Sequence, residues 1–196
     1  MTRKGIKPAV FLDRDGCISP DRYGYVSDPS IYSLYPWTGE ALRLLQQLGY
    51  LLFVVTNQSG IARGLFDIPA LNKVHARMHR LLAAQKVRLT GVYFSPYFAA
   101  GTVPPYNIHH KDRKPGIGMY ERARRKHSFD AGRSWMIGDR KTDVEFGRKA
   151  GLKTILLLTG EGAGEMMYGL ADWEYQPDFI AENLLTAAKL IQILHK

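Results

Sequence analysis

Residues 8–16 read PAVFLDRDG, an apolar run of five residues followed at once by two aspartates and a glycine. A continuous apolar run without polar alternation is typical of a parallel strand that is covered on both faces of a sheet. Asp13 and Asp15 come where this strand is predicted to end. Open α/β sheets bind their ligands at the carboxyl edge of the strands, so we expect both aspartates to lie at a binding site.

The same pattern recurs along the chain and predicts the fold class. Further apolar runs predict strands at residues 50–55, 91–94, 134–137 and 154–158, with a weaker last strand near 178–180. Helical patterns lie between them, at residues 40–48, 67–85, 118–126, 142–150 and 182–194. Strands that alternate with helices predict a doubly wound α/β fold with a Rossmann-like, mostly parallel sheet. The length of 196 residues favours a single domain over residues 1–196.

The composition indicates a globular protein with a basic surface. Hydrophobic residues make up 45% of the chain, and 27 Lys and Arg against 18 Asp and Glu give a net charge of +9. Such a charge favours anionic partners, although it also serves solubility alone. No apolar run approaches the roughly 18 residues that a membrane span needs, and the run before Asp13 is too short for a signal peptide. We therefore expect a cytoplasmic protein without a membrane partner, and the single Cys17 agrees with this expectation.

Four polar segments end or follow the predicted strands: DRDG at 13–16, TNQSG at 56–60, RKP at 113–115 and GDRKTD at 138–143. A carboxylate can attack phosphorus and form an acyl-phosphate, which divides the transfer into two easier steps. Oxygen-bound Mg²⁺ neutralises the repulsion between the anions, and a second carboxylate can exchange protons with the leaving group and with water. A lysine, a hydroxyl group and N–H groups can hold the transferring oxygens. The segments therefore favour phosphoryl transfer.

These segments resemble the four signature motifs of the haloacid dehalogenase (HAD) superfamily. The matching strings are FLDRDG at 11–16, VVTNQSG at 54–60, RKP at 113–115 and IGDRKTD at 137–143. The longer string TNQSGIARGLF at 56–66 is similar to the heptose bisphosphate phosphatases of the histidinol-phosphatase subgroup. The resemblance implies a HAD-like core with short loop inserts and no large cap domain. It also implies a Mg²⁺-dependent phosphatase that removes the 7-phosphate of D-glycero-D-manno-heptose 1,7-bisphosphate.

The resemblance further implies a role for each motif residue. Asp13 would be the nucleophile, and Asp15 the general acid and base. Thr56 would hold a phosphoryl oxygen, and Lys114 would neutralise charge on the nucleophile and the phosphate. The implied Mg²⁺ ligands are Asp13, the backbone carbonyl of Asp15, and Asp139, with Asp143 in support. The residues implied in substrate binding are Asp21, Gly24, Tyr25, Asn57, Gln58, Ser59, Arg113 and Arg140.

The chain departs from these relatives where many of them hold a structural zinc ion. Those relatives use a Cys-x-His pair and then a Cys-x-Cys pair just before Arg-Lys-Pro. Here the first pair aligns with Ser95 and Tyr97, and the second with His110 and Asp112. Three of the four positions lack a soft ligand, so we expect no structural zinc. The aromatic and proline residues of this loop would have to hold it by packing instead.

Three other interpretations stay open at this point. The chain could cleave histidinol phosphate, as another phosphatase of the same subgroup. It could be a polynucleotide 3′-phosphatase, which the charge of +9 favours, although no aromatic stacking platform supports nucleic acid as a partner. It could also bind phosphate without catalysis, but pure binding needs no nucleophile. We expect a monomer that acts on a small phosphorylated sugar.

Overall fold

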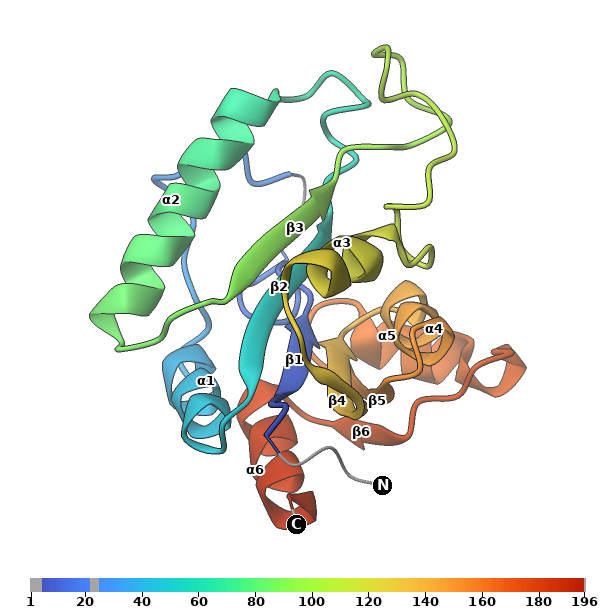
Figure 1. Cartoon of the computed structure of the whole chain (residues 1–196). Coiled ribbons are helices and arrows are strands. Elements are labelled where there is room, and N and C mark those ends of the chain that lie inside the picture. Colours follow the sequence, from blue (N-terminus) through green and yellow to red (C-terminus); the bar gives the residue numbers. More distant parts are fainter. Residues whose placement is uncertain (1–4, 22–24, 196) are drawn as a thin grey trace.

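The computed structural model describes residues 5–21 and 25–195. Within these ranges, six strands form one parallel sheet in the order β3-β2-β1-β4-β5-β6 (Figure 1). The strands are β1 (Pro8–Leu12), β2 (Leu51–Asn57), β3 (Gly91–Ser95), β4 (Asp130–Gly138), β5 (Lys153–Leu157) and β6 (Phe179–Ala181). The predicted doubly wound α/β fold is confirmed.

Helices connect the strands and cover both faces of the sheet. They are α1 (Thr38–Gln47), α2 (Ile68–Ala84), α3 (Gly118–Lys126), α4 (Lys141–Lys149), α5 (Gly162–Tyr168) and α6 (Leu184–Leu194), with a 3-10 turn η1 (Leu170–Asp172). Side chains that accept hydrogen bonds from the first turn fix where α2 and α6 begin. Asp67 accepts from the N–H group of Ala70 at 2.8 Å. Asn183 accepts from those of Leu185 and Thr186.

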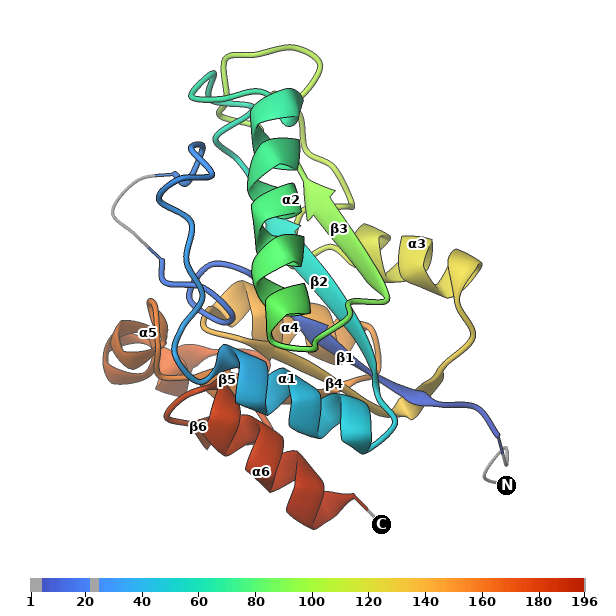
Figure 2. The same ribbon diagram turned by 90° about the vertical axis from the view of Figure 1, so that its left-hand side faces the viewer.

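Alternate residues of the central strand serve opposite faces of the sheet. In β1, Val10 and Leu12 belong to the core beneath α1, α2 and α6, whereas Ala9 and Phe11 pack toward α3 and α4. Figure 2 looks onto the side that carries α1, α2 and α6. Because both faces are covered, the strand is apolar along its whole length, and this is why a continuous run predicts it.

The structure differs from the sequence prediction in two places. β4 begins at Asp130, earlier than the predicted residue 134, because the Asp130 N–H group donates to the carbonyl of Lys7 and pairs a polar segment with the chain before β1. α5 is not predicted, because its glycines and its exposed Met167 and Tyr168 form no continuous apolar face. The turn η1 is not predicted either, whereas the other strands and helices lie where they are predicted, apart from their end residues. Among the described residues, no helix has the length and apolar character to cross a membrane.

Candidate active site

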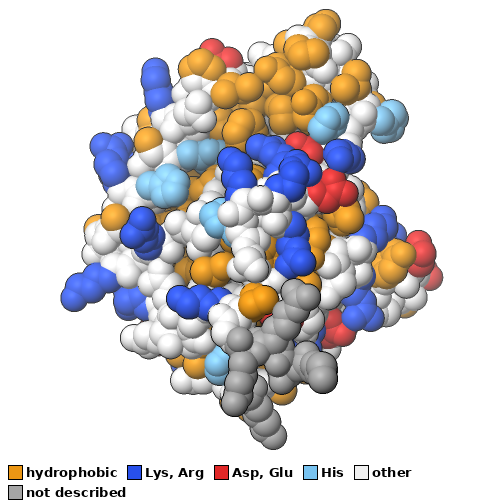
Figure 3. Space-filling view, viewed as in Figure 1, with side chains coloured by type: hydrophobic (Ala, Val, Ile, Leu, Met, Phe, Trp, Pro, Cys, Tyr) orange, Lys and Arg blue, Asp and Glu red, His pale blue; other side chains and the backbone are white. Residues whose placement is uncertain are grey.

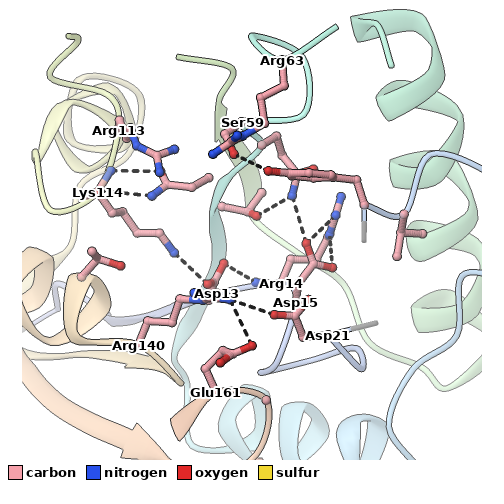
Figure 4. Close-up of a pocket in the computed structure, with 17 residues that line it drawn as sticks. Asp13, Arg14, Asp15, Asp21, Ser59, Arg63, Arg113, Lys114, Arg140 and Glu161 are labelled. Atoms are coloured by element: carbon pink, nitrogen blue, oxygen red, sulfur yellow. Dashed lines mark hydrogen bonds and ion pairs between the residues drawn. The ribbon is translucent and has the colours of Figure 1, made fainter. Parts of the chain in front are cut away.

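The predicted polar segments meet at the carboxyl edge of the sheet. β1 and β4 are neighbours there, and the order of the strands changes direction between them, which is where open α/β sheets form a crevice. The N–H group of Asp13 donates to the carbonyl of Ile137 at 3.0 Å, so the chain beyond β1 stays beside the chain beyond β4. A pocket of about 700 Å³ opens at this edge (Figure 4). Asp13, Asp15, Thr56 and Lys114 all line it.

Three buried carboxylates crowd the base of the pocket. One oxygen atom from each of Asp13, Asp139 and Asp143 lies within 4.8 Å of the others. Lys114 reaches into this cluster, with its Nζ atom 3.0 Å from Asp13 Oδ2 and 2.6 Å from Asp143 Oδ1. Burial alone would lower the pKa of Lys114, but these two carboxylates outweigh burial and raise the pKa. One lysine therefore faces three acidic groups.

The crowding changes the protonation of the carboxylates. Burial, and then repulsion from Asp143 and Asp15, raises the pKa of Asp13 to about 7, although Lys114 opposes the shift. Burial and the charges of Asp13 and Asp143 also raise the pKa of Asp139 well above its ordinary value of 3.8. A buried cluster of this kind gains stability from any further cation that enters it.

The donor set of this cluster suits a hard divalent cation. Mg²⁺ prefers oxygen ligands and takes one or two carboxylates together with phosphate and water. Asp139 Oδ2 accepts from the N–H group of Glu161 at 2.9 Å, whereas the buried Oδ1 atom has no hydrogen-bond partner among the described residues. A buried carboxylate oxygen without a donor needs a partner, and a cation supplies one. The residues at the base of the pocket therefore fit Mg²⁺.

Two glycines make room for the Asp139 carboxylate. Gly16, the last residue of the FLDRDG motif, has a φ of +83°, and Gly160 has a φ of +57°. A Cβ atom on either residue would collide with Asp139 Oδ2. The motif therefore needs glycine at position 16 for two reasons, its left-handed backbone and the close approach of a predicted metal ligand.

Asp15 is held in place by neighbouring side chains. Arg14 donates to both of its carboxylate oxygens, at 2.9 Å and 2.6 Å, and Gln58 Nε2 donates to it at 3.0 Å. Burial would raise the pKa of Asp15, but the Arg14 ion pair and these hydrogen bonds together lower it. Arg14 is itself buried, 3.4 Å from His75 and above the ring of Tyr32. Arg14 is not predicted from the sequence, and here it fixes the orientation of Asp15.

Asn57, the last residue of β2, ties this strand to the segment that carries Lys114. Its Oδ1 atom accepts from the N–H group of Lys114 at 3.0 Å, and its Nδ2 atom donates to the Lys114 carbonyl at 3.2 Å. This double contact fixes the backbone from which the lysine side chain extends. Gln58 donates to Thr56 Oγ1 at 2.9 Å as well as to Asp15. Asn57 and Gln58, which are predicted to bind substrate, thus make their observed contacts to other site residues.

Other predicted substrate-binding residues lie around the mouth of the pocket. Tyr25 and Ser59 both line it, and the Tyr25 hydroxyl lies 3.0 Å from Ser59 Oγ. Arg113 also lines the pocket and donates to the carbonyl of Tyr97 at 3.3 Å. Gly24 lies outside the described residues.

Arg140 and Asp21, both predicted to bind substrate, are partners of one another. Arg140 lies 3.0 Å from Asp21 Oδ2 and 3.6 Å from Glu161 Oε1. Glu161 is a pocket residue that is not predicted from the sequence, although its position just after the strand at 154–158 was an available signal. Arg63 is a second one, and its place in the TNQSGIARGLF string was its signal.

The rim loop, residues 96–112, contains three of the four positions that align with the zinc ligands of relatives, and Ser95, the fourth, comes just before it. The rings of Tyr97 and His110 stack at 3.8 Å between centroids. Ser95 Oγ accepts from the N–H group of Tyr97 at 3.4 Å, and His110 Nδ1 accepts from that of Asp112 at 3.1 Å. A hydroxyl, a phenol, an imidazole and a carboxylate do not make the thiolate-rich set of a structural zinc site. These side chains do not fit zinc, and its absence from the protein stays a prediction.

Comparisons with known proteins agree with this geometry. The model of a HAD-hydrolase-like family matches residues 112–187. A D-glycero-D-manno-heptose-1,7-bisphosphate 7-phosphatase from Thermosynechococcus vestitus is 38% identical over 189 residues, which cover 94% of this chain and 95% of that protein. A D-glycero-beta-D-manno-heptose-1,7-bisphosphate 7-phosphatase from Vibrio cholerae is 40% identical over 166 residues, which cover 84% of this chain and 89% of that protein.

A solved structure extends the likeness to three dimensions. The crystal structure of D,D-heptose 1,7-bisphosphate phosphatase from B. bronchiseptica, complexed with magnesium and phosphate, matches with a TM-score of 0.81 at 30% identity. The match covers 95% of this chain and 99% of that chain. The parallel sheet, the carboxylate pocket and these similarities define a HAD-like phosphatase. The chain belongs to the family of the D-glycero-D-manno-heptose-1,7-bisphosphate 7-phosphatases. The predicted placement in the histidinol-phosphatase subgroup is not supported by these relatives.

Proposed function

We propose that the protein removes the 7-phosphate of D-glycero-D-manno-heptose 1,7-bisphosphate, with Mg²⁺ as cofactor and an aspartyl-phosphate on Asp13 as intermediate. The observation that carries the proposal is the cluster of Asp13, Asp139 and Asp143 around Lys114 at the base of the pocket. A protein that only binds phosphate has no use for crowded acidic groups at the point where an anion must enter. Relatives that match along 94% and 84% of the chain support the choice of substrate.

Asp13 and Asp15 divide the chemical work between them. A carboxylate oxygen of Asp13 attacks phosphorus, and the bond between phosphorus and the sugar oxygen breaks. Asp15 gives a proton to that sugar oxygen. Because Arg14 lowers the pKa of Asp15, this carboxylate must take up the proton as the substrate enters. Asp15 then takes a proton from water while the water oxygen attacks phosphorus and the bond from Asp13 to phosphorus breaks. Inorganic phosphate leaves, and both carboxyl groups return to their starting protonation.

The surrounding residues hold the reacting groups. Lys114 neutralises negative charge on Asp13 and on the transferring oxygens, and the Thr56 hydroxyl holds one of those oxygens. Asp139 and Asp143 would hold Mg²⁺ together with Asp13. When bound, the cation reduces the repulsion between the carboxylates and the incoming phosphate.

Phosphate release from several substrates tests this proposal. The purified protein is given the heptose 1,7-bisphosphate, histidinol phosphate or a 3′-phosphorylated oligonucleotide, and phosphorus NMR identifies which phosphate is lost. We expect Mg²⁺-dependent loss of the 7-phosphate, with a kcat/KM at least about tenfold above the other substrates. A higher efficiency with histidinol phosphate or with the oligonucleotide would contradict the proposal. The relatives described above favour neither alternative.

A further inference from the structure

A histidine of α2 lies buried behind the pocket without lining it. His75 stands near the middle of the helix, and only 8% of it is exposed. The other buried residues of α2 are all apolar: Leu71, Val74, Met78 and Leu82. A polar ring that is buried among apolar side chains needs a hydrogen-bond partner. The identity of that partner connects α2 to the reacting groups.

The partner of His75 is Arg14, the residue between the two aspartates of the first motif. His75 Nε2 lies 3.4 Å from Arg14 Nη1. A guanidinium group only donates hydrogen bonds, so His75 Nε2 is the acceptor and the ring carries its proton on Nδ1. Burial, and then the charge of Arg14, lowers the pKa of His75 to about 3, which agrees with a neutral ring.

Arg14 uses different edges of its guanidinium group for Asp15 and for His75. Nε and Nη2 donate to the two carboxylate oxygens of Asp15, at 2.9 Å and 2.6 Å, and Figure 4 marks these contacts with dashed lines. Nη1 faces His75, and within residues 5–21 and 25–195 it has no other acceptor. Because the guanidinium group is planar and rigid, an acceptor for Nη1 also fixes the plane in which the other two nitrogens meet Asp15.

Packing fixes the buried part of this row of contacts. Arg14 is 1% exposed, and its guanidinium carbon lies 5.9 Å from the centroid of the Tyr32 ring. The ring of His75 meets that of Phe94 in β3 edge to face, with 5.9 Å between centroids. Asp15 differs from these residues because it lines the pocket and keeps 24% of its side chain exposed. The row of contacts therefore runs from the core to a carboxylate that faces the pocket.

We propose that His75 is a positioning residue for the general acid and base, and that it acts through Arg14 to hold the Asp15 carboxyl group at the leaving oxygen. This inference rests on the proposed function, because it needs Asp15 to carry protons. Without His75, the buried Nη1 group lacks an acceptor, and the guanidinium group is free to turn away from Asp15. A displacement of a reacting group by about 1 Å can cost on the order of 100-fold in rate, so a contact outside the pocket affects proton transfer.

The dependence of the rate on the leaving group tests this role. p-Nitrophenyl phosphate has a leaving group that departs without a proton, whereas the leaving group of phenyl phosphate benefits from one. In His75→Leu we expect kcat/KM for phenyl phosphate to fall by about tenfold, a part of the 10²- to 10⁴-fold that a general acid supplies. The value for p-nitrophenyl phosphate should change by less than about twofold. A variant that only loosened the fold would lower both values by the same factor, because their ratio does not depend on the fraction of folded protein.

Three further variants sharpen the test. His79→Leu is the matched control, because His79 lies one turn further along α2 and is exposed, and its ratio of the two rates should equal that of the wild type. His75→Gln should recover most of the loss with phenyl phosphate, since its amide oxygen can accept from Arg14 in place of Nε2. Arg14→Lys keeps the charge but cannot contact Asp15 and His75 together, so it should show the selective loss even if His75→Leu does not fold. An unchanged ratio in His75→Leu, or in Arg14→Lys, would overturn the proposal.

Asp15→Asn separates a failure of this proposal from a failure of the proposed function. This variant should show the same selective loss as His75→Leu and to a greater extent, and if it did not, Asp15 would not be the proton carrier. If Asp15→Asn showed the selective loss and His75→Leu did not, the role of His75 alone would be lost. In the double variant, His75→Leu should add no selective loss to that of Asp15→Asn, because both changes act on one group. A further selective loss in the double variant would mean that His75 does not act through Asp15.

Discussion

The base of the pocket and the rim loop differ in what their side chains do for the fold. At the base, Asp13, Asp139 and Asp143 are buried against one another, and the crowding raises the pKa of Asp13 to about 7. In the rim loop, Tyr97 stacks on His110 at 3.8 Å between ring centroids. Figure 3 shows hydrophobic side chains gathered at the top of the molecule, over the loops that follow β2 and β3, with basic side chains below them. The acidic side chains at the base repel one another, whereas the side chains of the rim loop pack together and stabilise it.

This difference indicates which region limits activity and which limits stability. Groups arranged for a reaction often lower the free energy of unfolding, because their mutual repulsion is relieved only when ligands bind. Aromatic contacts in a loop reduce its freedom and add stability, and they affect the reaction only through the residues they position. We therefore expect substitutions at the base to remove activity while keeping or raising stability. Substitutions in the rim loop should instead lower stability slightly and have only small effects on activity.

The largest effect is expected for Asp13→Asn. The amide keeps the shape of the side chain and removes the charge needed to attack phosphorus, so kcat should fall by a factor of about 10³ or more. Phosphate release at saturating substrate and Mg²⁺ measures this fall, and circular dichroism should show an unchanged fold. Asp172→Asn makes the same chemical change at an exposed position outside the pocket and should leave kcat as it is. Normal turnover in Asp13→Asn would remove Asp13 from its proposed role.

Removal of metal should have an effect of similar size. Excess EDTA should abolish phosphate release, and added Mg²⁺ should restore it, because three buried acidic groups and a phosphate dianion repel one another strongly without a cation. The rim loop should not respond, since its positions do not fit zinc. Activity that persisted in EDTA would mean that the carboxylate cluster works without a bound metal ion.

The next effect in size is expected for Asp15→Asn. This variant should lose about 10²- to 10⁴-fold in turnover, because the leaving oxygen and the attacking water both lose their proton carrier. An activated ester such as p-nitrophenyl phosphate should still transfer its phosphoryl group to Asp13, so a phosphorylated protein should accumulate and be visible by mass spectrometry of the intact chain. If no phosphorylated species formed with any substrate, the two-step reaction would be contradicted.

The base of the pocket could be predicted from the sequence, whereas most of the rim contacts could not. Asp13 follows a continuous apolar strand within a motif, so its place at the sheet edge needs no knowledge of distant contacts. Arg63 meets Phe98, and Arg140 meets Asp21, only after the loops of several strands fold together. No periodicity links the members of these pairs. These pairs also decide which arginine has a carboxylate partner. The sequence could not show that Arg140, which is predicted to bind substrate, is paired with Asp21.

Properties of the whole protein are a third group. We expect a cytoplasmic monomer that forms one domain, and these statements stay predictions. The net charge of +9 does not show where cations gather. In the fold, Arg63 and Arg113 meet in the pocket while Arg14 is buried against Asp15, so the same residue type does different work according to its partners.

The raised pKa of Asp13 should make the stability of the metal-free protein depend on pH. The pKa of Asp13 is about 7 in the folded protein, above the ordinary value of 3.8. Between these pH values the folded protein keeps a proton that the unfolded chain has lost, so the free energy of unfolding falls as the pH rises. The contribution of Asp13 to stability is therefore fully present below about pH 4 and is lost as the pH rises through 7. Asp13→Asn should therefore raise the free energy of unfolding at pH 8 by about 1–3 kcal/mol. Urea unfolding in EDTA at pH 5 and pH 8 measures the free energy of unfolding of both proteins. An equal gain in Asp13→Asn at the two pH values would show that the raised pKa of Asp13 is not the cause.

The smallest effect is expected in the rim loop, for Tyr97→Leu. Loss of the stacked ring should lower the free energy of unfolding by about 1 kcal/mol, the usual value of one aromatic pair. Because Phe98 is the next residue and holds Arg63 and Arg113, KM for the heptose bisphosphate should rise a few fold while turnover of p-nitrophenyl phosphate stays the same. Tyr168→Leu, at a side chain that is 85% exposed, should change neither quantity.

A zinc-selective chelator completes this last test. If packing holds the rim loop, the chelator should leave the unfolding midpoint and the KM of the wild-type protein unchanged, and elemental analysis should find no stoichiometric zinc. A chelator that reproduced the effect of Tyr97→Leu would mean that a metal holds the loop. Both the base of the pocket and the rim loop would then depend on bound metal, and the two regions would no longer differ in this respect.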